Sequence, residues 1–166
     1  MNYHNITKDD MLNGDGLRVV LWVAGCSHHC KGCQNPITWN EKSGLYFDEK
    51  AKCEIFDLLE KDYISGITFS GGDPLMPCNR EVVGNLIKEI TVKFPNKNIW
   101  LYTGFTFDEV KDLDFIKFVD VLVDGRFEEN LKDEKLLWKG SSNQRVIDVK
   151  KSLNNNTICL HCGDYN

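Results

Sequence analysis

Residues 19–33 read Val-Val-Leu-Trp-Val-Ala-Gly-Cys-Ser-His-His-Cys-Lys-Gly-Cys, and the rest of the sequence is interpreted outward from them. The apolar run 19–25 predicts a buried strand, and three thiols spaced C-x3-C-x2-C follow it directly. A helix also fits this spacing, but it would spread Cys26 and Cys33 over about 10 Å, whereas metal–sulfur bonds measure roughly 2.3 Å. Because glycines accompany the thiols, we predict a loop in which Cys26, Cys30 and Cys33 wrap around a metal centre.

The number of thiols narrows the choice of metal. Structural zinc normally takes four protein ligands, and although His28 or His29 could supply the fourth, neighbouring residues on a tight loop seldom all reach one tetrahedral ion. Iron–sulfur clusters usually take four cysteines, so three would hold a four-iron cluster at three corners and leave one iron open for a substrate. A 4Fe-4S cluster is the favoured interpretation, with zinc and metal-free thiols as the alternatives.

Length and composition set the class of protein. A chain of 166 residues can form one domain with a substantial core but not two full-sized domains, so we expect a single domain over residues 1–166. Its 42% hydrophobic and 27% charged content is that of a soluble globular protein. The net charge of -5, with no block rich in Lys and Arg, argues against nucleic acid as a partner.

The apolar run before the first cysteine superficially resembles the end of an export signal. Such a signal needs a positive segment before it, but here Lys8 and Arg18 are outweighed by Asp9, Asp10 and Asp15. The run is also far too short to cross a membrane. We therefore expect a cytoplasmic protein that does not associate with membranes.

Strands and helices are expected to alternate after the cysteine loop. Buried strands are predicted at 19–25, 66–69, 99–102 and 119–123, with a candidate final strand at 145–149, and helices are predicted after the capping residues Asp48, Asn79 and Thr106. This alternation is typical of parallel βαβ units. Since four such strands cannot close an eight-stranded barrel, the fold class is α/β, as a partial, open (β/α) barrel.

Three further segments have no clear period. Residues 1–17 end in a turn-rich approach to the first strand, and the irregular segment 34–44 is expected to cover the metal centre. Residues 128–143 are expected to pack over one edge of the sheet. Residues 154–166 are expected to form a loosely attached tail.

A second motif follows the predicted strand 66–69. In Ser70-Gly71-Gly72-Asp73-Pro74, two glycines allow close approach of the backbone to a ligand, although an ordinary tight turn explains the same residues. Ligands of open α/β sheets gather at the carboxyl ends of the strands. Cys26, Gly71, Gly104 and Asp124 are all predicted to lie there.

Taken together, the cysteine loop and the Gly-Gly-Asp-Pro motif resemble those of the radical S-adenosylmethionine enzymes. The resemblance implies a partial barrel of that type, a 4Fe-4S cluster on Cys26, Cys30 and Cys33 through which these cysteines act in catalysis, and an open iron that chelates the amino and carboxylate groups of S-adenosyl-L-methionine. It also implies that Gly71, Gly72 and Asp73 orient the methionyl ammonium. The implied cofactor-binding residues are Gly32, Gln34, Ser70, Gly71, Gly72 and Asp73.

Within that superfamily, the chain resembles the activating proteins of anaerobic ribonucleoside-triphosphate reductases. The similar stretches are Met1–His4, Asn13–Arg18, Cys26–Trp39, Ser70–Leu75, Val121–Phe127 and Gly140–Gln144. The resemblance implies an enzyme that reductively cleaves S-adenosyl-L-methionine and generates a glycyl radical on the large catalytic subunit of the reductase. It also implies a low-potential electron donor such as a flavodoxin or ferredoxin.

Two other functions compete with this one. The first is a small-molecule radical S-adenosylmethionine enzyme, such as the short ones that build deazaguanine nucleosides. The second, from a different class, is a non-catalytic zinc module that binds proteins. Metal analysis separates the zinc module, and product analysis without a partner separates the small-molecule enzyme.

The remaining chemically notable residues receive structural interpretations. Seven cysteines in a chain that is not exported do not indicate a disulfide framework, and Cys53 and Cys78 are expected to be buried or half-buried thiols. The pair Cys159 and Cys162 fits a redox pair, half of a zinc site or an inert tail end.

Histidine, acidic and tryptophan side chains near the motifs are treated in the same way. His28 and His29 are expected to face solvent rather than to support the metal site. Asp120 and Asp124 either line the site or form turns. Trp22, Trp39, Trp100 and Trp138 are expected to be core or partner-facing residues.

Overall fold

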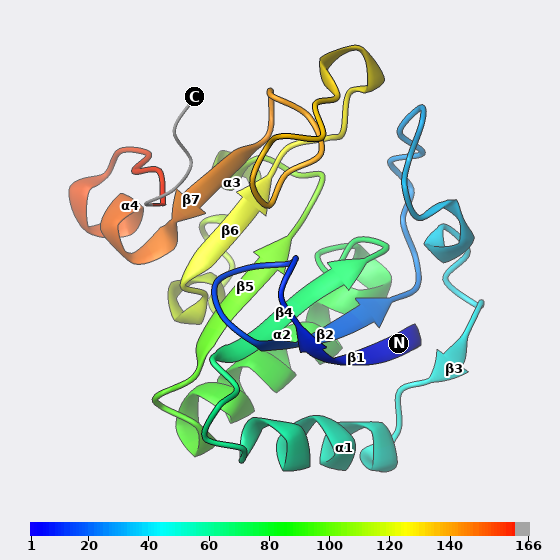
Figure 1. Ribbon diagram of the computed structural model, residues 1–166, viewed down its shortest axis with the longest axis vertical. Helices are drawn as coiled ribbons and strands as arrows, with labels where there is room; N and C mark the ends of the chain where they lie inside the picture. Colours follow the sequence, from blue (N-terminus) through cyan, green and yellow to red (C-terminus); the bar gives the residue numbers. More distant parts are fainter. Residues whose placement is uncertain (162–166) are drawn as a thin grey trace.

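The computed structural model describes residues 1–161 and centres on one seven-stranded sheet (Figure 1). The strands are β1 (Asn2–Asp10), β2 (Arg18–Val23), β3 (Leu45–Tyr46), β4 (Gly66–Gly71), β5 (Asn98–Tyr102), β6 (Val121–Asp124) and β7 (Arg145–Asp148). Their order across the sheet is β3-β1-β2-β4-β5-β6-β7. The central strands β2, β4, β5 and β6 are parallel, and β1, β3 and β7 are antiparallel to their neighbours.

The central strands are those that the sequence predicted, and the candidate strand at 145–149 is present as β7. Their connections contain α1 (Glu49–Leu59), α2 (Pro77–Lys93) and the short α3 (Phe107–Val110), and α4 (Val149–Asn155) follows β7. Single 3-10 turns lie at Pro36–Thr38, Ile116–Phe118 and Glu129–Leu131. The open sheet confirms the α/β class and is consistent with a partial, open (β/α) barrel.

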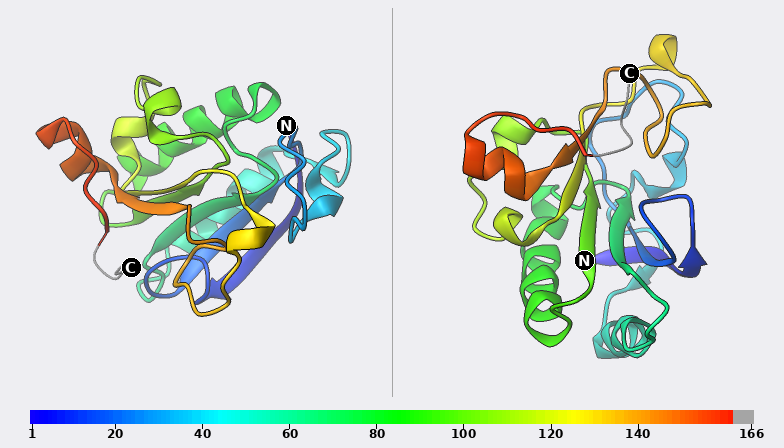
Figure 2. Two further views of the ribbon diagram at one scale, coloured as in Figure 1. Left: turned by 90° about the horizontal axis from the view of Figure 1, so that it is seen from above. Right: turned by 60° about the vertical axis from the view of Figure 1, so that its left-hand side comes forward.

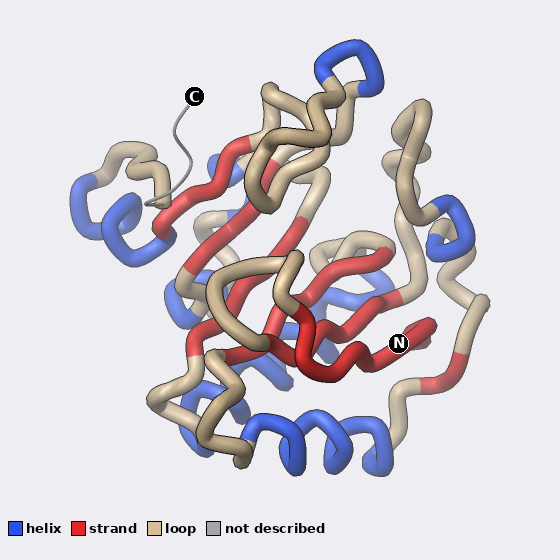
Figure 3. Tube along the Cα trace, in the orientation of Figure 1, coloured by secondary structure: helices blue, strands red, loops and turns tan. Residues whose placement is uncertain are grey.

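The two faces of the sheet are packed differently, because side chains alternate along each strand. One face packs against α1 and α2 in a large core that contains Leu21 and Phe69. The other carries Trp100, Val121, Val123 and Val146, with Tyr102 and Trp138 packed against them. Figure 2 shows α2 and α3 on one side of the sheet and irregular loops on the other, where Figure 3 traces them in tan. Helices therefore cover one face of the sheet and loops cover the other.

Two of the three predicted helix caps are confirmed. The Asp48 carboxylate accepts a hydrogen bond from the Ala51 amide, and Thr106 and Glu109 form a capping box, although the helix that it opens is only four residues long. The third prediction is wrong: α2 begins at Pro77, with Met76 at the N-cap position, so Asn79 lies inside the helix. Proline suits that first turn because it lacks the amide hydrogen that a helix start leaves unpaired.

The aperiodic interpretation of residues 1–17 is also wrong, because β1 occupies Asn2–Asp10. Two register shifts interrupt its pairing with β2, and such irregularities break the alternation by which a strand is recognised. The short β3 was not predicted either. No helix within residues 1–161 has the length and apolar character needed to cross a membrane.

The expectation that the chain is loosely attached from residue 154 onward is wrong for the described residues 154–161. Helix α4 extends to Asn155, and residues 159–161 run beside β7. The Asp148 amide donates to the Cys159 carbonyl at 2.9 Å, and the His161 amide donates to the Val146 carbonyl at 2.8 Å. The last part of the expected tail, 162–166, lies outside the described residues.

Candidate functional site

The cysteine loop begins where β2 ends and is held by the irregular segment after it. The Gly25 amide donates to the Thr38 carbonyl at 2.7 Å, and the Cys26 amide donates to the Trp39 carbonyl at 3.0 Å. The predicted cover of residues 34–44 therefore lies directly against the loop. Within the loop, the Cys33 amide donates to the Cys30 carbonyl at 3.1 Å and closes a turn.

The three loop cysteines line one cavity with a volume of about 500 Å³. All three thiols are free and partly buried. Across residues 1–161, no three His, Cys, Asp or Glu side chains gather closely enough to bind one metal ion. The thiols are thus not arranged around a single ion, whereas the ligands of an iron–sulfur cluster attach to different iron atoms.

The donor set suits such a cluster chemically, because thiolates are the ligands that iron–sulfur clusters take in proteins. Burial raises the pKa of the Cys26 thiol to about 11. The metal-free protein therefore holds a proton on this sulfur at neutral pH, and binding of a metal must displace it.

The glycine motif packs directly against the cysteine loop. The Gly72 amide donates to the Val23 carbonyl at 2.8 Å, and the Asp73 amide donates to the Gly25 carbonyl at 2.9 Å. Gly71 has a φ of +101°, and a Cβ on Gly72 would lie 2.6 Å from the Gly25 carbonyl oxygen. Both glycines are therefore required by this close approach of two loops.

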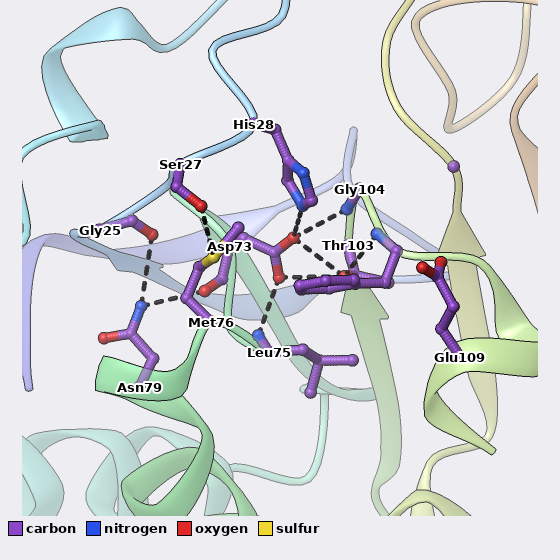
Figure 4. Close-up of polar contacts among 12 residues, drawn as sticks. Gly25, Ser27, His28, Asp73, Leu75, Met76, Asn79, Thr103, Gly104 and Glu109 are labelled. Atoms are coloured by element: carbon purple, nitrogen blue, oxygen red, sulfur yellow. Dashed lines mark hydrogen bonds and ion pairs between the residues drawn. The ribbon is translucent and has the colours of Figure 1, made fainter.

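The Asp73 carboxylate is buried and joins three loops (Figure 4). It accepts hydrogen bonds from the Leu75 amide at 2.8 Å, from the Gly104 amide at 2.9 Å and from the Thr103 hydroxyl at 3.0 Å. His28 Nε2 lies 2.7 Å from its Oδ2. Because a carboxylate only accepts hydrogen bonds, the shared proton is assigned to Nε2.

The prediction that His28 faces solvent is wrong. Its side chain is only 5% exposed, and its ring packs edge-on against Phe105 with centroids 4.8 Å apart. Its partner Asp73 lies 45 residues away in the sequence, so no local pattern predicts this placement. His29 is exposed, as expected, and its ring lies against Trp39.

Asn79 also contributes to the site, although the sequence predicted it to be a helix cap. Its side chain is buried, and Nδ2 donates to the Ala24 carbonyl at 2.8 Å and to the Asp73 carbonyl at 3.0 Å. Asn79 thus ties the start of the cysteine loop to the glycine motif from the first turns of α2.

The structure brings together most of the residues that the sequence proposed. Those that line the cavity are Cys26, Cys30, Cys33, Gln34, Ser70, Gly71, Gly72 and Asp73. Gly32 is not among the lining residues, and a Cβ there would meet the Glu129 carboxylate instead. Other lining residues, for which no specific role was predicted, include Asn13, Tyr102, Thr103 and Gln144.

Of the other residues noted in the sequence, some line the cavity and others connect the segments around it. Trp22 and Trp138 line the cavity, while Trp100 is buried in the core. Asp124 accepts from the Phe107 amide at 2.7 Å and pairs with Arg145, and Asp120 accepts from the Ile99 amide at 2.8 Å. Neither aspartate lines the main cavity; both join neighbouring segments of the framework.

The cysteines outside the loop are only partly as expected. Cys53 and Cys78 are exposed, so the prediction of buried or half-buried thiols is wrong for both. Cys53 lies on α1, whereas the Cys78 sulfur, at the start of α2, lies beside Gly25 of the cysteine loop. Cys159 is partly buried, and its possible partner Cys162 lies outside the described residues.

Comparison with known proteins places this geometry in a family. A model of the 4Fe-4S single cluster domain matches residues 12–147. The anaerobic ribonucleoside-triphosphate reductase-activating protein of Enterobacteria phage T4 is 49% identical over 146 residues, which cover 88% of this chain and 93% of the relative. The proteins of that name from Escherichia coli K12 and Pasteurella multocida are 42% and 40% identical, covering 90% and 88% of this chain and 100% and 96% of the relatives. The chain therefore belongs to the anaerobic ribonucleoside-triphosphate reductase-activating proteins, enzymes of the radical S-adenosylmethionine superfamily with a 4Fe-4S single cluster domain.

Proposed function

We propose that this protein reductively cleaves S-adenosyl-L-methionine and generates a glycyl radical on the large subunit of the anaerobic ribonucleoside-triphosphate reductase. The observation that carries the proposal is a single cavity lined both by Cys26, Cys30 and Cys33 and by the Ser70–Asp73 motif. The proposed cluster ligands and a backbone that a ligand can approach thus share one cavity at the carboxyl ends of parallel strands.

In this proposal Cys26, Cys30 and Cys33 hold the 4Fe-4S cluster. When bound, the cluster supplies the low-potential electron that cleavage of a sulfonium requires. Reduction of the cluster needs a low-potential donor protein, and we propose a flavodoxin or ferredoxin. The proposed location is the cytoplasm, and no association with membranes or nucleic acid is proposed. One continuous core that runs from Ile6 to Val149 supports a single domain.

The glycine motif is proposed to position the cosubstrate. Gly71 and Gly72 have no side chain between their backbone and the cavity, so main-chain polar groups can approach a ligand. Ser70 and Gln34 line the same wall. The Asp73 carboxylate is only 1% exposed and already accepts hydrogen bonds from three other residues and His28, so its proposed part is to fix the backbone that meets the methionyl group.

The test is an anaerobic assay with reduced protein, S-adenosyl-L-methionine and the large subunit. We expect formation of 5′-deoxyadenosine together with a glycyl radical signal by electron paramagnetic resonance. Cys26→Ser, Cys30→Ser and Cys33→Ser should each lose iron and both products. The matched control Cys53→Ser changes an exposed thiol on α1 and should retain them.

Two results would contradict the proposal. Zinc without iron or sulfide in anaerobically prepared protein would favour the binding module. Consumption of a small nucleoside precursor without any partner, and no radical on the large subunit, would favour the small-molecule enzyme.

A further inference from the structure

Two loops with exposed apolar side chains flank the proposed cosubstrate cavity. The first joins β1 to β2 and carries Met11 and Leu12, which are 71% and 81% exposed. The second follows the 3-10 turn Glu129–Leu131 and carries Leu136 and Leu137, the latter 50% exposed. We call these four residues the apolar rim. Leu12 and Leu136 line the same cavity as the loop cysteines, so each loop contributes one rim residue to the cavity, and Met11 and Leu137 are the neighbours of these residues in the sequence.

The first loop presents its side chains from a fixed backbone. The amides of Leu12 and Asn13 both donate to Asp10 Oδ1 at 2.9 Å. The Thr68 hydroxyl, in the middle of β4, donates to the Asn13 carbonyl at 2.7 Å. Figure 1 shows the loop, in dark blue, folded back over the sheet. The exposure of Met11 and Leu12 is therefore a property of an ordered loop.

The second loop is anchored at both of its ends. The Ser142 amide donates to the Leu131 carbonyl at 2.9 Å, and Lys132 forms a bridge with Ser141. Trp138 adopts a positive φ of 60°, and its ring packs edge-on against buried Trp100 with centroids 5.0 Å apart. This packing anchors the backbone beside Leu136, which lines the cavity, and beside the exposed Leu137.

Loops ordered in this way can bind a partner at a lower entropic cost than mobile ones. Exposed apolar side chains that cluster at one place mark an interaction site more often than scattered ones do. Val92 is a useful contrast, since it is 84% exposed but lies on α2, on the helical side of the sheet. Exposure alone thus does not single out the rim; its position at the cavity mouth does.

We infer that the apolar rim is the surface on which the large reductase subunit docks, with a segment of that subunit passing between the two loops into the cavity. The inference rests on the proposed function, which requires a glycine Cα of the partner to come within roughly 3 to 3.5 Å of the reacting atoms. The cavity is bounded by Leu12 and Leu136 where these loops meet it, so an entering polypeptide contacts the rim. A few apolar anchors supply most of the affinity of such an interface.

The test uses Met11→Glu and Leu137→Glu, since neither residue lines the cavity, with Val92→Glu as the matched control for adding a charge at an exposed apolar position. Two activities are measured anaerobically with loaded enzyme: 5′-deoxyadenosine formed without the large subunit, and glycyl radical formed against the concentration of that subunit. We expect the rim variants to need about tenfold more large subunit for the half-maximal rate, with uncoupled cleavage unchanged. Met11→Leu, Leu137→Met and Val92→Glu should behave like the unchanged protein.

The outcomes separate this inference from the function on which it rests. Failure of the unchanged protein to cleave S-adenosyl-L-methionine or to produce the radical overturns the proposed function. Normal radical formation with an unaltered concentration dependence in both rim variants overturns the docking surface alone. Sedimentation analysis tests whether a second copy of this chain binds to the rim instead. If the rim substitutions dissociate a dimer without changing the dependence of radical formation on the large subunit, the rim is a self-association surface and the inference is wrong.

Discussion

His28 and Asp73 join the cysteine loop to the glycine motif through a buried hydrogen bond of 2.7 Å between Nε2 and Oδ2. The two residues belong to loops that follow different parallel strands, β2 and β4, and a third loop joins them through Thr103 and Gly104 (Figure 4). The spacing between the proposed cluster ligands and the proposed cosubstrate loop therefore depends on this pair.

The first prediction concerns His28→Phe. Phenylalanine keeps an aromatic ring beside Phe105 but removes the hydrogen bond to a buried carboxylate, whose loss costs about 1 to 3 kcal/mol. We expect the cysteine loop to separate from the glycine motif, with about a tenfold higher KM for S-adenosyl-L-methionine and a smaller change in kcat. The kinetics of 5′-deoxyadenosine formation measure KM and kcat, and the iron content per chain shows whether the cysteine loop still holds its metal.

His29→Phe is the matched control, since it makes the same change at an exposed ring on the same loop. His28→Gln, which can still donate a hydrogen bond, should recover part of the loss. A His28→Phe protein with an unchanged KM and iron content would show that the pair has no positioning role.

The second prediction concerns Asn79→Asp. The amide nitrogen of Asn79 faces the carbonyl oxygens of Ala24 and Asp73, and a carboxylate would place a negative oxygen against these acceptors in a buried position. We expect the free energy of unfolding to fall by about 2 to 3 kcal/mol. Urea unfolding of the metal-free protein measures it, and Asn85→Asp, at an exposed position of the same helix, should change it by less than about 0.5 kcal/mol.

The third prediction concerns Gly72→Ala. The added Cβ would lie 2.6 Å from the Gly25 carbonyl oxygen, and because that atom belongs to the backbone it cannot rotate away. We expect the two loops to move apart, at a cost of about 1 to 3 kcal/mol, with reduced iron content after reconstitution. Iron analysis and thermal unfolding would reveal this, and an alanine variant that reconstitutes fully would contradict the close packing.

The fourth prediction concerns Arg18→Met. Arg18 is fully buried and donates to the Thr68 hydroxyl at 2.8 Å, to Asn98 Oδ1 at 2.6 Å and to the Ile67 carbonyl at 2.8 Å. Burial lowers the pKa of its guanidinium to about 10, so the group remains charged at neutral pH. Methionine would leave these acceptors unpaired, and we expect a loss of about 3 kcal/mol in unfolding free energy.

Exposed Arg126 provides the comparison for this change. Arg126→Met should leave the unfolding curve nearly unchanged. Equal stability of the two variants would mean that the buried hydrogen bonds of Arg18 contribute no net stability.

The fifth prediction is a pH dependence of thiol alkylation in the metal-free protein. Only the thiolate reacts, and burial raises the pKa of Cys26 to about 11, so its thiolate fraction at neutral pH is small and increases with pH. We expect Cys26 to be alkylated more slowly than exposed Cys53 at neutral pH, with a rate that still rises at about pH 10. Peptide mass spectrometry after timed alkylation measures both rates, and a Cys26 rate that levels off below pH 9 would contradict it.

The sequence predicted the repeating part of the fold because that part follows from local pattern. The apolar runs of β2, β4, β5 and β6 are buried on both faces, and buried parallel strands have nearly continuous apolar sequences. The caps at Asp48 and Thr106 involve residues three positions apart, so they too are visible locally. By contrast, β1 was missed because its bulged pairing with β2 interrupts the alternation of side chains.

The sequence by itself determined the fold class, the family and the two motifs, since each depends on residue types at short, fixed spacings. Only the tertiary structure decided that His28 is buried on Asp73, that Asn79 ties two loops together and that Leu12 and Leu136 line one cavity. Each of these relationships joins residues distant in the sequence that become neighbours only after the parallel strands align their carboxyl ends. A hydrogen bond across such a distance depends on the position and direction of both side chains, and neither is encoded in the local sequence around one of them.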